Sequence, residues 1–163
     1  MNQMPFVRLP KPRPLDRSDL PPDLAQFYAQ HEGVGRECDP DRSVRIHKLR
    51  EVARTDWAGL GLVADVPEGW EEFAGFRIGF GIYFEEIVYV LAAPTCPPGS
   101  VLAIGGSQDA PLVLAASLAG WLSHLERWGW AEPAIAPAWQ LSDQEWTEVR
   151  RYYLSLNPEL RGV

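Results

Sequence analysis

The feature that most constrains this fold is residues 76–106, FRIGFGIYFEEIVYVLAAPTCPPGSVLAIGG, the longest apolar stretch of the chain. It is rich in Ile, Val, Tyr and Phe and is interrupted by Gly and Pro, a composition that favours adjacent strands over one helix. Residues 87–91 and 101–104 are short apolar runs, as expected of strands covered on both faces. Residues 94–99 hold three prolines and a glycine, which predict a loop between these strands.

Glycines alternate with apolar residues at the start of this stretch. Gly79 and Gly81 separate Ile78, Phe80 and Ile82. Glycine inside a strand allows a β-bulge, a sharp bend or the close approach of another backbone. The stretch contains no nucleophile–base pair and no metal-ligand spacing, so it informs about the fold more than about chemistry.

Amphipathic helices are expected before and after the central strands in the sequence. Ser117 is a good N-cap for the second of them, and Ser142 with Glu145 forms a capping-box pattern at the start of the third. Apolar residues recur at helical spacing in each. The expected helices are residues 22–32, 118–127 and 142–157.

The remaining segments complete the expected sheet. Residues 43–49 alternate between apolar and polar side chains, which predicts a one-sided strand, and residues 48–54 are expected to continue as a helical turn. Residues 57–65 fit either a short strand or a packed loop, and residues 112–115 predict a last strand. Because the strands are grouped rather than alternating with helices, we expect an α+β fold with a mostly antiparallel sheet packed by an N-terminal helix and C-terminal helices.

The length of 163 residues predicts one domain. Residues 1–17 contain several prolines, and we expect them to form an extended arm. Residues 18–163 then form the single domain, closed by the helix at 142–157. A domain of this size buries enough surface to fold without a disulfide or a structural metal.

The net charge of −7 limits the classes of partner. It argues against nucleic acid and against an anionic membrane surface, which both require a basic face. It fits a basic protein partner, while solubility alone explains it equally well. Cys38 and Cys96 lie far apart and outside any CxxC motif, and no export signal is recognisable. We therefore expect a cytoplasmic protein with reduced thiols.

The residue pattern predicts no cofactor, no metal site and no catalytic set. His31 lies on the apolar side of its helix, where a packed histidine is favoured over a base. His47 and His124 fall on the polar sides of their elements, so we expect both at the surface. Carboxylates flank Cys38 and disfavour its thiolate, and Cys96 has no cationic neighbour in sequence. We therefore expect a protein that is not an enzyme.

Two pairs of adjacent glutamates, Glu71–Glu72 and Glu85–Glu86, contain the carboxylates that an acid–base mechanism needs. Adjacent residues of a strand face opposite sides, so only one of each pair can point at a given site. A solvated face is therefore the favoured interpretation of both pairs.

Partner binding is a second interpretation of the same region. Trp70, Tyr83, Phe84, Glu85 and Glu86 mix aromatic with acidic side chains around the sheet. Aromatic groups provide contact area and carboxylates steer a basic partner, so these five residues are candidate partner-binding residues. The alternative is that the aromatic side chains belong to the core and the acids keep the protein soluble. The edges of the central stretch, including the loop at 94–99, are where side chains are expected to leave the core.

Several short segments of the chain form a recognisable set: LPPDL (20–24) with Phe27-Tyr28, HEGVG (31–35), Ile78-Gly79, IVYV (87–90) and LAASLAGWL (114–122). Together they resemble the SUKH superfamily of Smi- and Knr-type immunity and regulatory proteins. The resemblance covers about residues 20–129 and leaves out the arm and the last helix. The sequence departs from the family at Glu32-Gly33, where the family commonly has Asn-Gly, and at Leu118 and Trp121, where it often has Phe.

The resemblance implies an α+β fold, no conserved catalytic set and, for many bacterial members, neutralisation of a partner toxin. Family members bind unrelated toxins, so no contact residue is carried over to this chain. We therefore expect a non-catalytic, protein-binding immunity protein whose partner is a basic toxin domain. A general regulatory module with a cellular protein partner, and a small hydrolase or ligand-binding domain with a deep pocket, remain the alternatives.

Overall fold

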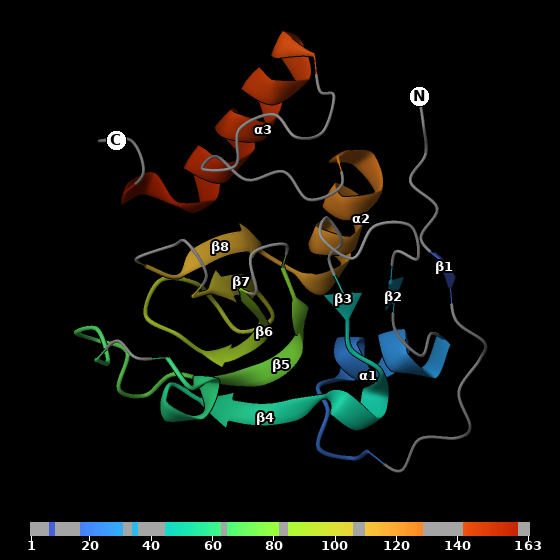
Figure 1. Ribbon diagram of the computed structural model, residues 1–163, viewed down its shortest axis with the longest axis vertical. Coiled ribbons are helices and arrows are strands. Elements are labelled where there is room, and N and C mark those ends of the chain that lie inside the picture. Colours follow the sequence, from blue (N-terminus) through green and yellow to red (C-terminus); the bar gives the residue numbers. More distant parts are fainter. Residues whose placement is uncertain are drawn as a thin grey trace.

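The computed structural model (Figure 1) describes residues 7–8, 17–30, 34–35, 45–62, 65–81, 85–105, 110–128 and 142–159. In this part of the chain, helices flank an antiparallel sheet, which confirms the expected α+β class. The helices are α1 (Pro22–Gln30), α2 (Leu118–Trp128) and α3 (Asp143–Leu156), with the 3₁₀ turns η2 (Leu49–Glu51) and η3 (Ala58–Leu60). The strands are β1 (Val7–Arg8), β2 (Val34–Gly35), β3 (Arg45–Ile46), β4 (Ala53–Asp56), β5 (Ala74–Phe80), β6 (Glu86–Ala92), β7 (Val101–Ile104) and β8 (Leu112–Ala115).

The described strands form one sheet in the order β1-β2-β3-β5-β6-β7-β8. Strand β4 is not part of this order. It pairs with β5 along residues 74–77, while β3 pairs with β5 at residues 79–80. Because β6 occupies the other side of β5, β3 and β4 share one side and are separated by η2. Strands β5 to β8 follow one another as antiparallel neighbours. Figure 1 shows β4 and β8 on opposite sides of the sheet.

The glycine-containing strand β5 is irregular. Arg77 pairs with Val88 and Gly79 with Ile87, so Ile78 is an extra residue on the β5 side, as in a β-bulge. This confirms one of the irregularities that the glycines predict.

One face of the sheet carries all three helices. Apolar side chains of the helices pack against alternate residues of β5 to β8. Such burial of one helix stripe against a sheet face is the main source of stability in a layered domain. The cluster includes Leu24 and Tyr28 of α1, Trp121 and Leu125 of α2, Val149 and Tyr153 of α3, and Phe76, Ile87, Tyr89, Val101 and Leu114 of the sheet.

The opposite face is covered by η3 and the residues that follow it. Trp57, Leu60, Trp70 and Phe73 are buried there against the second set of alternating strand residues. That set is Val88, Val90, Leu102, Ile104 and Val113. Both faces of the central strands are therefore covered, as their continuous apolar runs predict.

Hydrogen bonds fix α1 on the sheet. The Tyr89 hydroxyl donates to the Asp23 carboxylate at 2.6 Å, and the same Asp23 oxygen accepts the backbone N–H of Leu24 at 2.9 Å. The Tyr28 hydroxyl donates to the His47 carbonyl at 2.9 Å. These bonds tie the start of α1 to β6 and its last turn to the segment after β3.

The expected helix caps are present. The Ser117 hydroxyl accepts the N–H of Gly120 at 3.0 Å. Ser142 accepts the N–H of Glu145 at 3.3 Å, and the Glu145 carboxylate accepts the N–H of Ser142 at 2.9 Å, which completes the capping box. The capping pattern therefore predicts the start of α3 correctly.

Two histidines expected at the surface are buried. His47 is 7% exposed and its ring lies edge-on to Phe80, because β3 ends at Ile46 and the alternation does not continue to His47. His124 is also 7% exposed, stacks on Tyr152 and lies 3.3 Å from the Tyr153 hydroxyl. Helix α3 covers the side of α2 that the periodicity of α2 alone assigns to solvent, so both surface expectations are wrong.

Other expectations change in extent. The strand expected at 43–49 shortens to β3, with residues 43–44 outside the described residues, and η2 takes the place of the helical turn. Residues 57–65 contain η3 and no strand in their described part. Within the expected arm, Val7–Arg8 forms β1, and Arg17 donates to the carbonyls of Leu49 and Val52. His31 lies outside the described residues.

Candidate protein-binding surface

The structure buries three of the five candidate partner-binding residues. Trp70 is 5% exposed, Glu86 is 8% exposed and Glu85 is fully buried. Tyr83 and Phe84 lie outside the described residues. The expectation that Trp70, Glu85 and Glu86 offer their side chains to a partner is therefore not met, and the partner-binding role itself stays a prediction.

Glu86 is held inside the sheet by an ion pair. Its carboxylate accepts two hydrogen bonds from the guanidinium of Arg77 on the neighbouring strand β5, one of them at 2.9 Å. A charged group is tolerated away from water when such a partner neutralises it. Glu86 therefore acts as a partner of Arg77 across the strand pair.

Trp70 belongs to an aromatic cluster on the second face of the sheet. Its ring centroid lies 5.7 Å from that of Trp57 and 5.4 Å from that of Phe73, and the Trp57 and Phe73 centroids are 6.1 Å apart. Tilted and edge-to-face contacts at these distances are favourable. The cluster packs on the central strands and forms a rigid base for residues 65–73.

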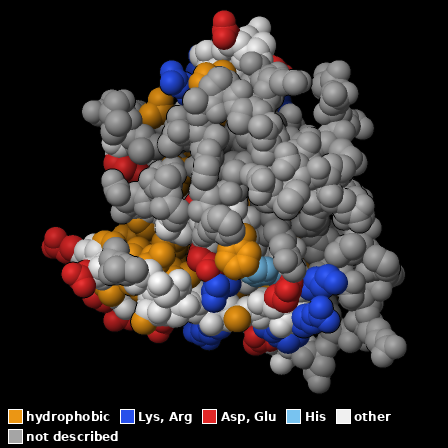
Figure 2. All heavy atoms as spheres, in the orientation of Figure 1, with side chains coloured by type: hydrophobic (Ala, Val, Ile, Leu, Met, Phe, Trp, Pro, Cys, Tyr) orange, Lys and Arg blue, Asp and Glu red, His pale blue; other side chains and the backbone are white. Residues whose placement is uncertain are grey.

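Carboxylates project from the outer side of this base. Between Arg54 and Arg77 the chain contains no Lys, Arg or His. Figure 2 shows acidic side chains around a hydrophobic patch at the lower left, where residues 65–72 lie in Figure 1. We call this the acidic surface, and its exposed carboxylates are Asp65, Glu68, Glu71 and Glu72.

Turns hold the acidic surface in place. The N–H of Trp70 donates to the Pro67 carbonyl at 3.0 Å, and the N–H of Phe73 donates to the Trp70 carbonyl at 3.1 Å. Gly69, between them, has φ +85°, a left-handed conformation that glycine adopts without strain. The exposed glutamates therefore stand on consecutive turns whose intervening aromatic side chains point inward.

Apolar groups adjoin the carboxylates. Val66 is 45% exposed. A Cβ at Gly69 would lie 3.9 Å from the Cβ of Pro94, so the loop at 94–99 touches the acidic surface. Pro94, Pro97 and Pro98 are exposed in that loop, as expected for its side chains. The surface therefore combines negative charge with apolar contact area.

The same loop contains Cys96. Burial raises the pKa of its half-buried thiol, and the neighbouring Ser100 and Thr95 side chains oppose this shift. The neutral thiol is therefore favoured, which disfavours nucleophilic attack. Among the described residues, no group of three or more His, Cys, Asp or Glu side chains is arranged to hold a metal ion.

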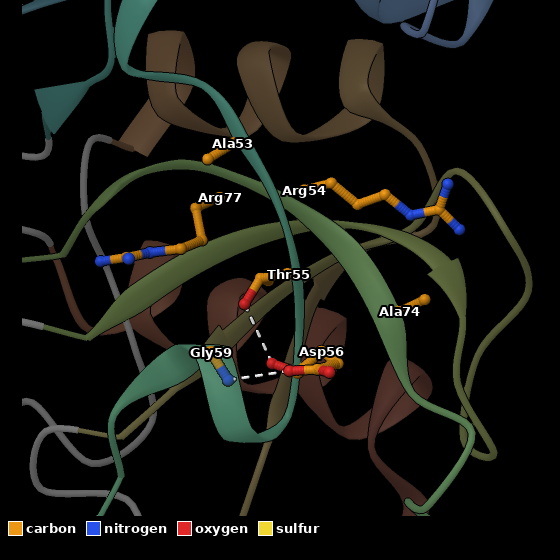
Figure 3. A pocket seen from close by; sticks show the side chains of 7 residues that line it. All are labelled: Ala53, Arg54, Thr55, Asp56, Gly59, Ala74 and Arg77. Carbon is orange, nitrogen blue, oxygen red and sulfur yellow. Dashed lines mark hydrogen bonds between the residues drawn. The ribbon is translucent and has the colours of Figure 1, made fainter.

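A depression of about 520 Å³ lies at strand β4. Figure 3 shows the side chains of Arg54 and Arg77 extending to opposite sides of the strand, so the two guanidinium groups do not converge. The Asp56 carboxylate points back to its own chain and accepts the N–H of Gly59 at 2.8 Å. The lining residues are Ala53, Arg54, Thr55, Asp56, Gly59, Ala74 and Arg77.

The acidic surface follows from a signal that the sequence contains. Glu71 and Glu72 fit the expected solvated face, because both are exposed. The same expectation is wrong for Glu85 and Glu86, because the structure buries both side chains. The informative feature is the run of 22 residues between Arg54 and Arg77, which contains acidic residues and no cation. The inward direction of Trp70 depends on tertiary packing, which the local sequence does not reveal.

None of the helices in the described residues is long and apolar enough to cross a membrane.

Comparison with known proteins assigns no family to the chain. No family model, no curated protein and no solved structure matches this chain significantly.

Proposed function

We propose that this protein is a non-catalytic binding domain that engages a basic protein partner through the acidic surface. The observation that carries the proposal is the exposure of four carboxylates, Asp65, Glu68, Glu71 and Glu72, on a segment without a cation and above a packed aromatic base. Fixed charges of one sign attract an oppositely charged partner and raise its rate of association.

Shape and composition support binding to a protein. Carboxylates alone provide steering, whereas affinity depends on desolvated apolar contacts near the centre of an interface. Val66 and the exposed prolines of the loop at 94–99 offer such contacts beside the acids. The turns between Pro67 and Phe73 are already hydrogen-bonded, so little ordering is needed when a partner binds.

The most concrete form of the proposal is an immunity protein that neutralises a toxin. The resemblance of residues 20–129 to the SUKH superfamily supports this form, as does the net charge of −7. In this role the acidic surface covers a basic functional face of the toxin domain and blocks it by occupying it. A general regulatory module would bind through the same acidic surface and would differ only in the identity of its partner.

Co-expression tests the proposal. The protein encoded by the adjacent reading frame is expressed alone and together with this chain, and growth of the host is measured. We expect toxicity that this chain suppresses, together with a complex at about micromolar concentration. A non-toxic neighbour, or no complex at that concentration, would contradict the toxin-neutralising role.

Charge-reversal variants locate the binding surface. Glu71→Lys changes the acidic surface, and Glu159→Lys makes the same change at an exposed residue beyond the end of α3. We expect Glu71→Lys to weaken suppression of toxicity and Glu159→Lys to leave it unchanged. Equal effects of the two variants would remove the acidic surface from the proposal.

A further inference from the structure

Strand β4 has an open edge. Among the described residues β5 is its only partner strand, and its other side borders the depression of about 520 Å³. Residues from both sides of the strand line this depression, so the depression follows the edge of the sheet (Figure 3). An edge strand presents backbone N–H and C=O groups that can pair with another strand.

At the opposite edge of the sheet, side chains cover the backbone of the last strand. At β8, side chains of α3 and of its C-cap form hydrogen bonds with the backbone of the strand. Asn157 bonds to the N–H and the carbonyl of Val113, and the Tyr152 hydroxyl donates to the Leu114 carbonyl at 2.8 Å. At β4, the Thr55 hydroxyl donates to the Asp56 carbonyl at 2.9 Å, and this bond remains within the strand. Within the described part of the chain, α3 thus closes one edge of the sheet, and no strand pairs with the free edge of β4.

Charges along β4 are self-complementary. Arg54 and Asp56 are two residues apart and therefore lie on the same side of the strand. Both are exposed, and Arg54 forms no ion pair with a described residue. Asp56 uses Oδ1 to accept the N–H of Gly59, which leaves Oδ2 for another donor. In an antiparallel pair of identical strands centred on Thr55, each Arg54 stands opposite an Asp56.

We propose that a second copy of this chain adds to the open edge of β4, so that the two sheets join about a two-fold axis at Thr55. The contact is isologous, because the same strand serves both copies. Arg54 of each copy faces Asp56 of the other, on the side of the strand to which Arg54 extends in Figure 3. Opposite charges placed directly across an antiparallel pair are favourable, and like charges there are unfavourable.

The length of β4 sets the strength of this contact. Four residues form the strand. Such a short ladder buries less than the roughly 1,200 Å² of a stable specific interface. We therefore expect a reversible dimer with a dissociation constant of roughly 100 µM, which forms at high local concentration.

Sedimentation velocity over about 10 µM to about 1 mM tests the proposal. We expect the wild-type chain to dimerise across this range, and Arg54→Asp to weaken dimerisation roughly tenfold because it places carboxylates opposite one another. Arg50→Asp makes the same change in η2, outside the strand, and is expected to dimerise like the wild type. A wild-type chain that stays monomeric at about 1 mM, or an Arg54→Asp variant that dimerises like Arg50→Asp, overturns the proposal.

A mixing experiment adds a second criterion. Asp56→Lys is also expected to self-associate poorly, while a mixture of Arg54→Asp and Asp56→Lys restores both opposite-charge pairs and forms a heterodimer. Circular dichroism verifies that each variant is folded. Because Asp56→Lys removes the acceptor of the Gly59 N–H, Arg54→Asp with its control decides the outcome if Asp56→Lys does not fold. Folded variants that fail to associate when mixed overturn the proposed register.

Discussion

Asn157 pairs with Val113 through both polar groups of its carboxamide. Oδ1 accepts the Val113 N–H at 2.7 Å, and Nδ2 donates to the Val113 carbonyl at 2.9 Å. Asn157 is fully buried and is also the C-cap of α3. One side chain therefore takes the place of a neighbouring strand at β8 and holds the last helix against the sheet.

Asn157→Ala is expected to destabilise the fold by roughly 2–4 kcal/mol, because it leaves a buried N–H and a buried carbonyl of Val113 without partners. Urea unfolding followed by circular dichroism measures the effect. Ser155→Ala, an exposed position of the same helix, is expected to change stability by less than about 0.5 kcal/mol. Similar unfolding free energies for the two variants would show that the Asn157–Val113 pair does not stabilise the fold.

Trp70→Ala is expected to destabilise the fold by about 3–5 kcal/mol, the usual range for removing a buried aromatic side chain. Trp57 and Phe73 lose a packing partner, and the base of the acidic surface loosens. The same urea titration measures this loss. Val66→Ala, at the exposed residue of the surface, is the control and is expected to leave stability within about 0.5 kcal/mol of the wild type. A small effect of Trp70→Ala would indicate a solvent-facing tryptophan.

Gly75→Ala tests the close approach of β5 and β6. A Cβ at this position would lie 2.6 Å from the Tyr89 carbonyl oxygen and 2.4 Å from a methyl group of Val88. The backbone oxygen cannot move without disturbing the strand pair, so we expect destabilisation of roughly 1–3 kcal/mol. Unchanged stability would mean that the two strands are farther apart than the structure shows.

Stability is expected to fall in alkali because of two tyrosines. Burial and the hydrogen bond to Asp23 raise the pKa of Tyr89, and burial with the nearby Glu51 carboxylate raises the pKa of Tyr28. The folded state therefore keeps both phenols protonated at a pH where the unfolded chain loses the protons. The stabilisation is complete below the usual tyrosine pKa of about 10 and is lost as pH rises above it.

Urea midpoints between about pH 8 and about pH 11 measure this loss. The double variant Tyr28→Phe/Tyr89→Phe is expected to show a shallower decline than the wild type, because its rings do not ionise. Identical pH profiles for the two proteins would assign the alkaline transition to other groups.

Local patterns predict much of the fold. The apolar runs at 101–104 and 112–115 coincide with β7 and β8, and Ser142 with Glu145 marks the start of α3. These elements are predictable because their signals are local: a run bounded by turn residues, or a cap whose partner lies three residues away. The α+β class follows from the order of such elements.

Elements that depend on distant partners are not predictable in this way. Strand β4 has the burial pattern of a mostly exposed segment and is a strand because β5 lies beside it. His124 is buried because α3 covers α2, and Asn157 is buried because it completes β8. Each depends on contacts between residues at least 18 positions apart in the sequence.

The candidate surface is predictable only in its charge. The acids between Arg54 and Arg77 are visible in the sequence, whereas the inward orientation of Trp70 and the pairing of Glu86 with Arg77 are not. A tryptophan between turns fits a core and an interface equally well until its neighbours are known. Because Trp70 and Glu86 are buried, the proposed function uses the exposed carboxylates of the acidic surface as its candidate contacts instead.

The most direct test of the acidic surface is the affinity of this chain for the protein encoded by the adjacent reading frame, measured by calorimetry for wild type, Glu71→Lys and Glu159→Lys. We expect a wild-type complex that weakens roughly tenfold with Glu71→Lys, mainly through slower association, and stays within about twofold of wild type with Glu159→Lys. Binding that Glu71→Lys leaves unchanged, or that both variants weaken equally, would contradict recognition through the acidic surface.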